Sequence, residues 1–239
     1  MNSPNAAGEF TTGSAISCAK RVRVCGSFKA AAKAWCRRCT TSSGVAAGAT
    51  NPHQVSISSP DSTSDMAGTS AEMNVYGTLT LENQSTILLG DMAGTTSSAL
   101  WFRGTSALAG SGTVHFGTKR DYPWNGIYAR GTTVVAPGDA VVDTFTIGSG
   151  ITVTGNRGVF SSDENVAVKN QGTIAAILDG ASAPGLIDFY VFGPFVNEGT
   201  MTAADGEYLN GWTGTNTGTI RLLRGGSFLT TGSFRNEGS

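Results

Sequence analysis

Residues 119–130, KRDYPWNGIYAR, concentrate aromatic and charged side chains in a chain that has only 8% aromatic residues. Exposed aromatic rings stack on sugar rings, and carboxylate and guanidinium groups bond to sugar hydroxyls and carboxylates. This stretch therefore predicts a glycan-binding site formed by Asp121, Tyr122, Trp124, Tyr128 and Arg130. The same residues also fit a long loop whose rings only cover the side of the fold.

Acidic residues at regular spacing are the other candidates for chemistry. A glycosidase needs two carboxylates about 5–9.5 Å apart, and in a fold of stacked coils residues one repeat apart are neighbours. Intervals close to one repeat occur among Asp121, Asp139, Asp143, Asp163 and Glu164. Asp is equally typical of surface turns, and the only histidines, His53 and His115, have no acidic or cysteine motif beside them. We therefore expect no catalytic residue and favour a protein that is not an enzyme.

The four cysteines lie together in a basic segment. A zinc site built on Cys36 and Cys39 would need Cys18 and Cys25 as well. That second pair is spaced more widely than the ligand pairs of zinc sites usually are. No calcium-binding glycine–aspartate repeat and no phosphate-binding loop is present. We therefore expect neither a metal nor a cofactor.

Charge divides the chain near residue 50. Residues 1–50 hold seven Lys or Arg and one Glu, whereas the whole chain has a net charge of −1. A basic arm can bind nucleic acid, but no aromatic residues are interleaved with the charges and we expect no nucleic-acid partner. Residues 1–50 are expected to be a poorly ordered extension with a short helix near residues 28–35, where Ala and Lys favour helix. Residues 51–71 are rich in Ser, Thr, Gly and Pro and are expected to be a linker.

From residue 72 to residue 239 the chain consists of short β-prone runs that end at Gly or Asn. Within them apolar and small polar residues alternate: Ile151 and Val153 alternate with Thr152 and Thr154. A two-residue period predicts half-buried strands. No apolar run is long enough to cross a bilayer, so no membrane span is expected.

A four-residue phrase recurs in the last third of the chain as NQGT, NEGT, NTGT and NEGS. Its asparagines are nearly evenly spaced except for a longer first interval, and a period of roughly 20 residues built from short strands predicts a β-solenoid with one repeat per coil. Asn and Gly both tolerate the left-handed backbone of sharp corners, and stacked Asn amides can form a ladder. The extra residues of the longest interval are assigned to a loop at residues 179–185. The predicted turn ladder comprises Asn170, Asn197, Asn216 and Asn236 with Gly172, Gly199, Gly218 and Gly238.

The stretches FVNEGTMTAADGEYL and GTNTGTIRLLRGGSFLTTGSFRNEGS resemble the repeats of filamentous haemagglutinin-like and autotransporter adhesins. The resemblance covers residues 165–239 well and 72–164 loosely; NGIYARGTTVV is similar to repeats of pectin-lyase-like β-helices. It implies an all-β, right-handed parallel β-helix that is secreted or displayed on a bacterial surface. The implied function is adhesion or a structural stalk, with a carbohydrate or a host-surface receptor as partner. A polysaccharide lyase, a glycosidase or a tailspike-like glycan binder is the alternative.

The chain reaches residue 239 in the middle of a repeat, with no segment that reads as a cap. Stacked coils expose strand edges at an uncovered end. We therefore expect further solenoid repeats or another chain to cover that end.

Overall fold

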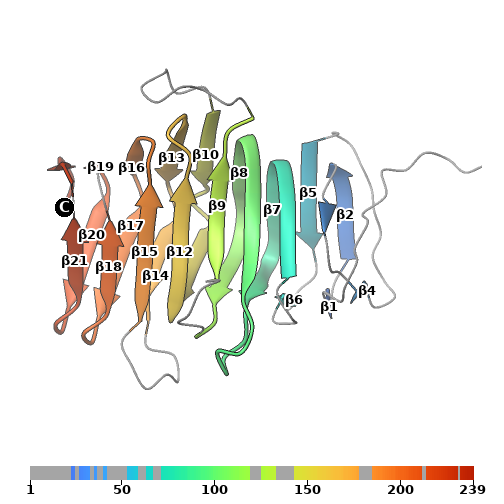
Figure 1. Ribbon diagram of the computed structural model, residues 1–239, viewed down its shortest axis with the longest axis horizontal. Helices are drawn as coiled ribbons and strands as arrows, with labels where there is room; N and C mark the ends of the chain where they lie inside the picture. Colours follow the sequence, from blue (N-terminus) through green and yellow to red (C-terminus); the bar gives the residue numbers. More distant parts are fainter. Residues whose placement is uncertain are drawn as a thin grey trace, which may run out of the picture.

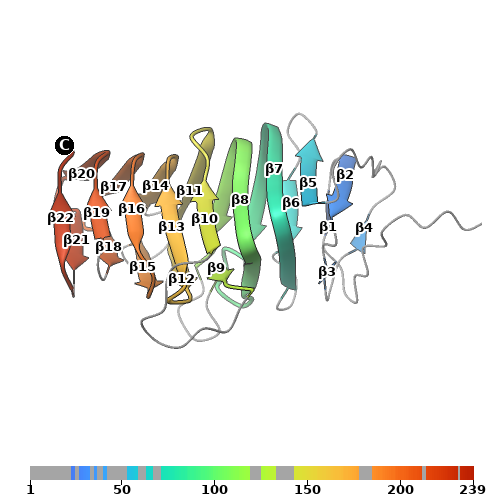
Figure 2. The ribbon, with the colours of Figure 1, turned by 90° about the horizontal axis from the view of Figure 1, so that it is seen from above.

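The computed structural model describes residues 71–118, 125–132, 143–177, 185–211, 214–230 and 232–239 in full, and six strands before residue 71 by their backbone alone. The protein is all-β, and no helix occurs in the part of the chain that the structure describes. Its strands cross the long axis of an elongated column, with the C-terminus at one end (Figure 1). Seen from above, the strands still lie side by side along that axis (Figure 2). The fold is a parallel β-solenoid, as the alternating pattern and the repeats predict.

Each coil contributes one strand to each of three faces, because strands three apart in sequence pair in parallel. Face A consists of β10 (Asp143–Ile147), β13 (Val166–Asn170), β16 (Phe195–Asn197), β19 (Gly214–Asn216) and β22 (Phe234–Asn236). Face B consists of β11 (Ile151–Gly155), β14 (Thr173–Ala176), β17 (Thr200–Ala204) and β20 (Thr219–Leu223). Face C consists of β9 (Gly126–Arg130), β12 (Arg157–Ser162), β15 (Leu186–Val191), β18 (Tyr208–Gly211) and β21 (Ser227–Thr230).

Two long strands, β7 (Ala71–Leu89) and β8 (Ser98–Phe116), each run round all three faces, and they pair with each other in parallel along their length. Their bends fall at residues with positive φ, such as Gly77 in β7 and Gly104 in β8. A glycine adopts this left-handed backbone without steric cost. Glycine therefore turns the strand at these corners.

Strands also precede residue 71: β1 (Arg23–Val24), β2 (Ser27–Ala32), β3 (Trp35–Cys36), β4 (Thr40–Thr41), β5 (His53–Ser58) and β6 (Thr63–Met66). Strand β2 stands where a short helix near residues 28–35 was expected, and it pairs antiparallel with β5. Helix propensity is a weak preference that tertiary pairing overrides. Strands β5 and β6 pair in parallel with β7, so parallel stacking already begins within the expected linker at 51–71.

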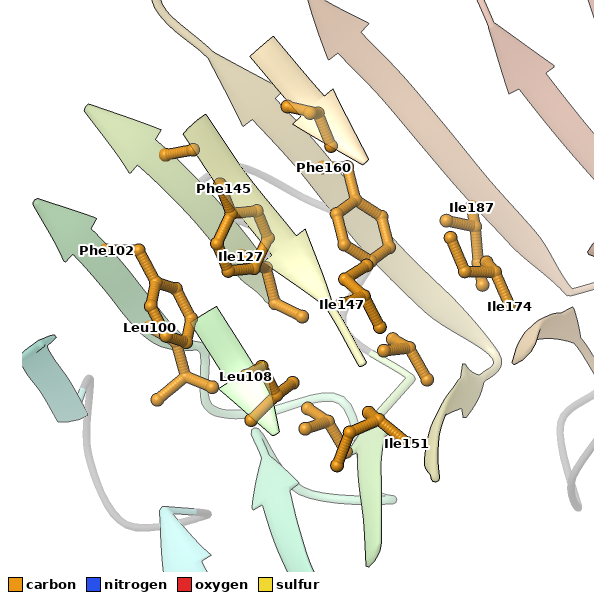
Figure 3. Close-up of a cluster of buried hydrophobic side chains, with 14 of the residues drawn as sticks. Leu100, Phe102, Leu108, Ile127, Phe145, Ile147, Ile151, Phe160, Ile174 and Ile187 are labelled. Carbon is orange, nitrogen blue, oxygen red and sulfur yellow. The ribbon is translucent and has the colours of Figure 1, made fainter. Parts of the chain in front are cut away.

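The core is a set of columns of inward side chains that stack from coil to coil (Figure 3). On face C, Phe160 stacks on Phe189 with ring centroids 5.3 Å apart. On face B, Ile151 and Val153 are buried, whereas Thr152 and Thr154, the residues that alternate with them, are half-buried. This is the inside and outside alternation that a two-residue period predicts.

Coil length is less regular than a constant period implies. Asn197 pairs with Asn216 one short coil later, but the partner of Val114 is Val153, which lies about two such coils further along the sequence. The strands stay in register because the added residues lie between strands. The extra residues between Asn170 and Asn197 likewise fall between β14 and β15. The loop expected at 179–185 belongs to that connection, and its residues 179–184 lie outside the described part of the chain.

Candidate functional site

The four repeated asparagines lie one above another on the inner side of face A. The side-chain amide of Asn170 donates to the amide oxygen of Asn197, Asn197 donates to Asn216, and Asn216 donates to Asn236, each at 2.6 Å. Asn170, Asn197 and Asn216 are fully buried. Buried amides need partners for both their donor and their acceptor, and the ladder supplies them along the axis.

The glycines two residues further on form a second column, directly above one another. A Cβ added to Gly199 would lie 2.1 Å from the carbonyl oxygen of Gly172, and one added to Gly218 would lie 2.2 Å from that of Gly199. The expected left-handed corner is not what the structure has, since none of the eight ladder residues has a positive φ. Glycine is required because consecutive corners approach too closely for any side chain, and the backbone N–H of Thr219 donates to the carbonyl of Gly199 at 2.8 Å. These columns build the solenoid.

A cluster of aromatic and basic residues lies on the outer side of face C. Trp101 of β8 stacks on Tyr128 of β9, with ring centroids 4.3 Å apart and an angle of 18° between the planes. The guanidinium groups of Arg103 and Arg130 lie 5.2 and 5.4 Å from the centroid of the Trp101 ring. Tyr76 of β7 pairs in register with Arg103 and is 41% exposed. We call these five residues the face C cluster.

Hydrogen bonds fix the two arginines of this cluster. Arg103 donates from Nε to the amide oxygen of Asn74 at 3.1 Å. Arg130 forms an ion pair with Asp163, with 2.6 Å between Nη1 and Oδ1, and Asp163 also accepts from the backbone N–H of Gly131. Both guanidinium groups are therefore held against the rings, in the geometry of cation–π contacts.

The indole nitrogen of Trp101 adds an unusual element. Nε1 is buried and has no hydrogen-bond partner among the described residues. A buried Trp normally finds an acceptor for this N–H.

The structure describes two of the five predicted glycan-site residues. Tyr128 and Arg130 come together in the face C cluster, whereas Asp121, Tyr122 and Trp124 lie outside the described residues. Trp101 and Arg103 were missed because they belong to an earlier strand and become neighbours of Tyr128 and Arg130 only through strand register. The aromatic–x–basic pattern in both WFR and YAR is the one signal that sequence reading could have used.

Two of the acids with repeat-like spacing, Asp143 and Asp163, accept from the backbone N–H groups of two adjacent residues, Thr132 and Gly131. Burial alone would raise the pKa of Asp143, but hydrogen bonds from Thr132 and Thr105 outweigh it and hold that pKa below its ordinary value. Asp163 is occupied by Arg130, and Asp121 and Asp139 lie outside the described residues. A carboxylate that is held ionised by such bonds is a poor general acid. Its role here is to fasten neighbouring coils.

The chain matches no protein family, no curated protein and no solved structure. Within the described residues no group of three or more His, Cys, Asp or Glu side chains could hold a metal ion. No helix that could cross a membrane is found there either. The face C cluster is therefore the candidate site on which a function can be argued.

Proposed function

We propose that this chain is a segment of a secreted or surface-exposed repeat protein that acts in adhesion, with a right-handed solenoid as the rigid support. The face C cluster is the binding element, and its ligand is a carbohydrate. The resemblance of the repeats to adhesin passengers supports this proposal, and so does the arrangement of the cluster. A structural stalk without a ligand is the variant of this proposal in which the cluster only strengthens the solenoid.

The single observation that carries the binding proposal is the stacked pair of Trp101 and Tyr128 on the outer side of face C, with the guanidinium groups of Arg103 and Arg130 at 5.2 and 5.4 Å from the Trp101 ring centroid. Guanidinium groups donate to hydroxyls or carboxylates of a glycan. The exposed ring of Tyr76 extends the cluster along the axis of the column. These groups favour acidic glycans over neutral ones, because Arg pairs bidentately with a carboxylate.

Two exposed tyrosines on face C give a matched test. Tyr76 belongs to the cluster and is 41% exposed, whereas Tyr208 in β18 is 38% exposed and lies several coils away. The full chain is applied to an array of neutral and acidic glycans, and Tyr76→Ala and Tyr208→Ala are compared on the glycans that bind. We expect Tyr76→Ala to weaken binding about tenfold, the equivalent of about 1.4 kcal/mol, and Tyr208→Ala to leave it unchanged.

Trp101→Ala completes the test, with its thermal unfolding midpoint measured beside binding because Trp101 also packs on Tyr128. Binding that disappears at temperatures where the variant remains folded supports the proposal. If the chain binds no glycan, or if the Tyr76→Ala and Trp101→Ala variants bind as well as the wild type, the structural stalk remains as its function.

A further inference from the structure

The sequence contains a single N-glycosylation signal, Asn83-Gln84-Ser85. An asparagine is a glycan acceptor where Ser or Thr stands two residues after it and the residue between them is not Pro. The phrases of the amide ladder do not meet this rule, because in Asn197-Glu198-Gly199-Thr200 the hydroxyl residue stands one place too late. Asn83 is therefore the one asparagine of this chain that carries the signal.

The signal lies at a corner of β7 that protrudes from the wall of the column. Before this corner Leu81 of β7 pairs with Gly110 of β8, and after it Ser85 pairs with Gly112. Residues 82–84 of β7 therefore stand opposite a single residue of β8. The two strands are in close contact before the corner, where a Cβ added to Gly110 would lie 2.0 Å from the carbonyl oxygen of Leu81. They are as close after it, where a Cβ added to Gly112 would lie 2.4 Å from that of Ser85. The two additional residues of β7 have no room between the coils and bulge outward.

Asn83 is accessible at this corner. Asn83 and Gln84 are both exposed, and both have a left-handed backbone, with φ of 55° and 56°. Asn adopts that conformation more readily than most residues with a side chain. The corner joins the parts of β7 that belong to faces A and B, so it does not border face C. A glycan on Asn83 would therefore extend into solvent and leave the face C cluster uncovered.

Ser85, the residue that a glycosyltransferase recognises together with Asn83, is inaccessible in the folded chain. Its exposed fraction is 0%, and it lies in register with Gly112 of the neighbouring coil. An enzyme that recognises both side chains can reach them only before β7 and β8 have paired. The fold therefore leaves the acceptor amide outside and encloses the hydroxyl that marks it.

We propose that Asn83 is the attachment site of an N-linked glycan, which is added before this part of the solenoid closes. The donor is a sugar activated as a diphosphate ester. The Nδ2 nitrogen of Asn83 bonds to the anomeric carbon, while the bond from that carbon to the diphosphate oxygen breaks and its electron pair leaves with the diphosphate. The nitrogen loses one proton to a base of the transferase. The products are an N-glycosylated amide and a free diphosphate. This site does not depend on the proposed ligand, because it lies at the corner that does not border face C.

Peptide mapping by mass spectrometry of the protein isolated from the cells that produce it tests the site. We expect the peptide that contains Asn83 to carry a sugar and the peptides that contain the four ladder asparagines to carry none. Asn83→Asp removes the acceptor amide but keeps a residue that tolerates a left-handed backbone, so it should lose the sugar. Gln84→Gly is the matched control, because it keeps the signal and suits the same backbone, and it should retain the sugar. The mass of the group identifies the donor: a monosaccharide indicates a nucleoside diphosphate, and an oligosaccharide indicates a polyprenyl diphosphate.

A second measurement tests the timing. A purified oligosaccharyltransferase with its lipid-linked oligosaccharide is offered the native full chain and the same chain freshly diluted from urea, and intact mass reports the modified fraction. We expect at least about tenfold more modification of the diluted chain, since in the native chain Ser85 becomes accessible only when the pairing with Gly112 opens. The proposal is overturned if Asn83 is unmodified in the protein from its own cells. It is also overturned if native and diluted chains are modified equally, or if neither is modified beside a peptide acceptor that is.

Discussion

Replacing Asn197 by Ala tests the amide ladder at a fully buried position. The substitution removes two hydrogen bonds of 2.6 Å, one from Asn170 and one to Asn216. It leaves the amide N–H of Asn170 and the amide oxygen of Asn216 buried without these partners. A buried polar group without a partner costs about 1–3 kcal/mol, so two such groups should lower the free energy of unfolding by about 2–6 kcal/mol. At about 2–4 °C per kcal/mol for a chain of this size, the thermal midpoint should fall by about 4–24 °C.

Asn236→Ala is the matched control. It removes one bond of the same length, but at an exposed position where water replaces the amide. We expect a loss below about 1 kcal/mol. Urea unfolding followed by circular dichroism measures both variants, and hydrogen exchange at the backbone N–H groups of Gly199 and Thr219 locates the loosened corner. Equal, small effects of the two substitutions would refute the view that the ladder stabilises the solenoid.

Three further perturbations separate the other contacts. Gly199→Ala should cost more than about 2 kcal/mol in urea unfolding, because its Cβ would meet a carbonyl oxygen at 2.1 Å, whereas Gly211→Ala, with its nearest atom at 3.7 Å, should stay within about 0.5 kcal/mol. The pKa of Asp143 is lower when folded than when unfolded, so the stability that it contributes is complete above its ordinary pKa and is lost as the pH falls through the lower folded value. Asp143→Asn should therefore cost about 1–3 kcal/mol at neutral pH, and the difference from the wild type should vanish in unfolding measured near pH 2. Arg224→Ala should change the unfolding free energy by less than about 1 kcal/mol, because its ion pair with Asp205 is exposed; a larger loss would show that the turns at this corner depend on that pair.

The class of fold can be predicted from the sequence because it depends on patterns within short stretches of the chain. A two-residue period in short runs, as at Ile151 and Val153, places every second side chain inside. The recurring Asn and Gly add a length scale for the coil. Together these patterns predict parallel stacking, since a coil that returns to its start lays each strand on the previous one in the same direction.

The register between distant strands could not be read in this way. Trp101 and Tyr128 stack because β8 pairs with β9 in one particular register, and no periodic signal in the sequence predicts that register. The reason why glycine occupies the corners could not be predicted either, because it also depends on contacts between coils. Gly199 and Gly172 have ordinary backbone conformations, and only the distance between two coils shows that a side chain has no room there.

One inward column of face A explains why only the last third of the chain reads as a repeat. In the earlier coils the column is apolar, with Leu108 beneath Ile147, and an apolar side chain sets no fixed partner, so the connections between strands are free to vary in length. From Asn170 onward each Asn must meet another Asn one coil away, which keeps the phrase recognisable and moves insertions to other corners. The column changes from apolar side chains to asparagines at Asn170, which lies above Ile147. The amide oxygen of Asn170 has a partner there, because it accepts from the backbone N–H of Gly172 at 3.2 Å. A ladder that starts on an apolar side chain therefore leaves no buried acceptor unpaired.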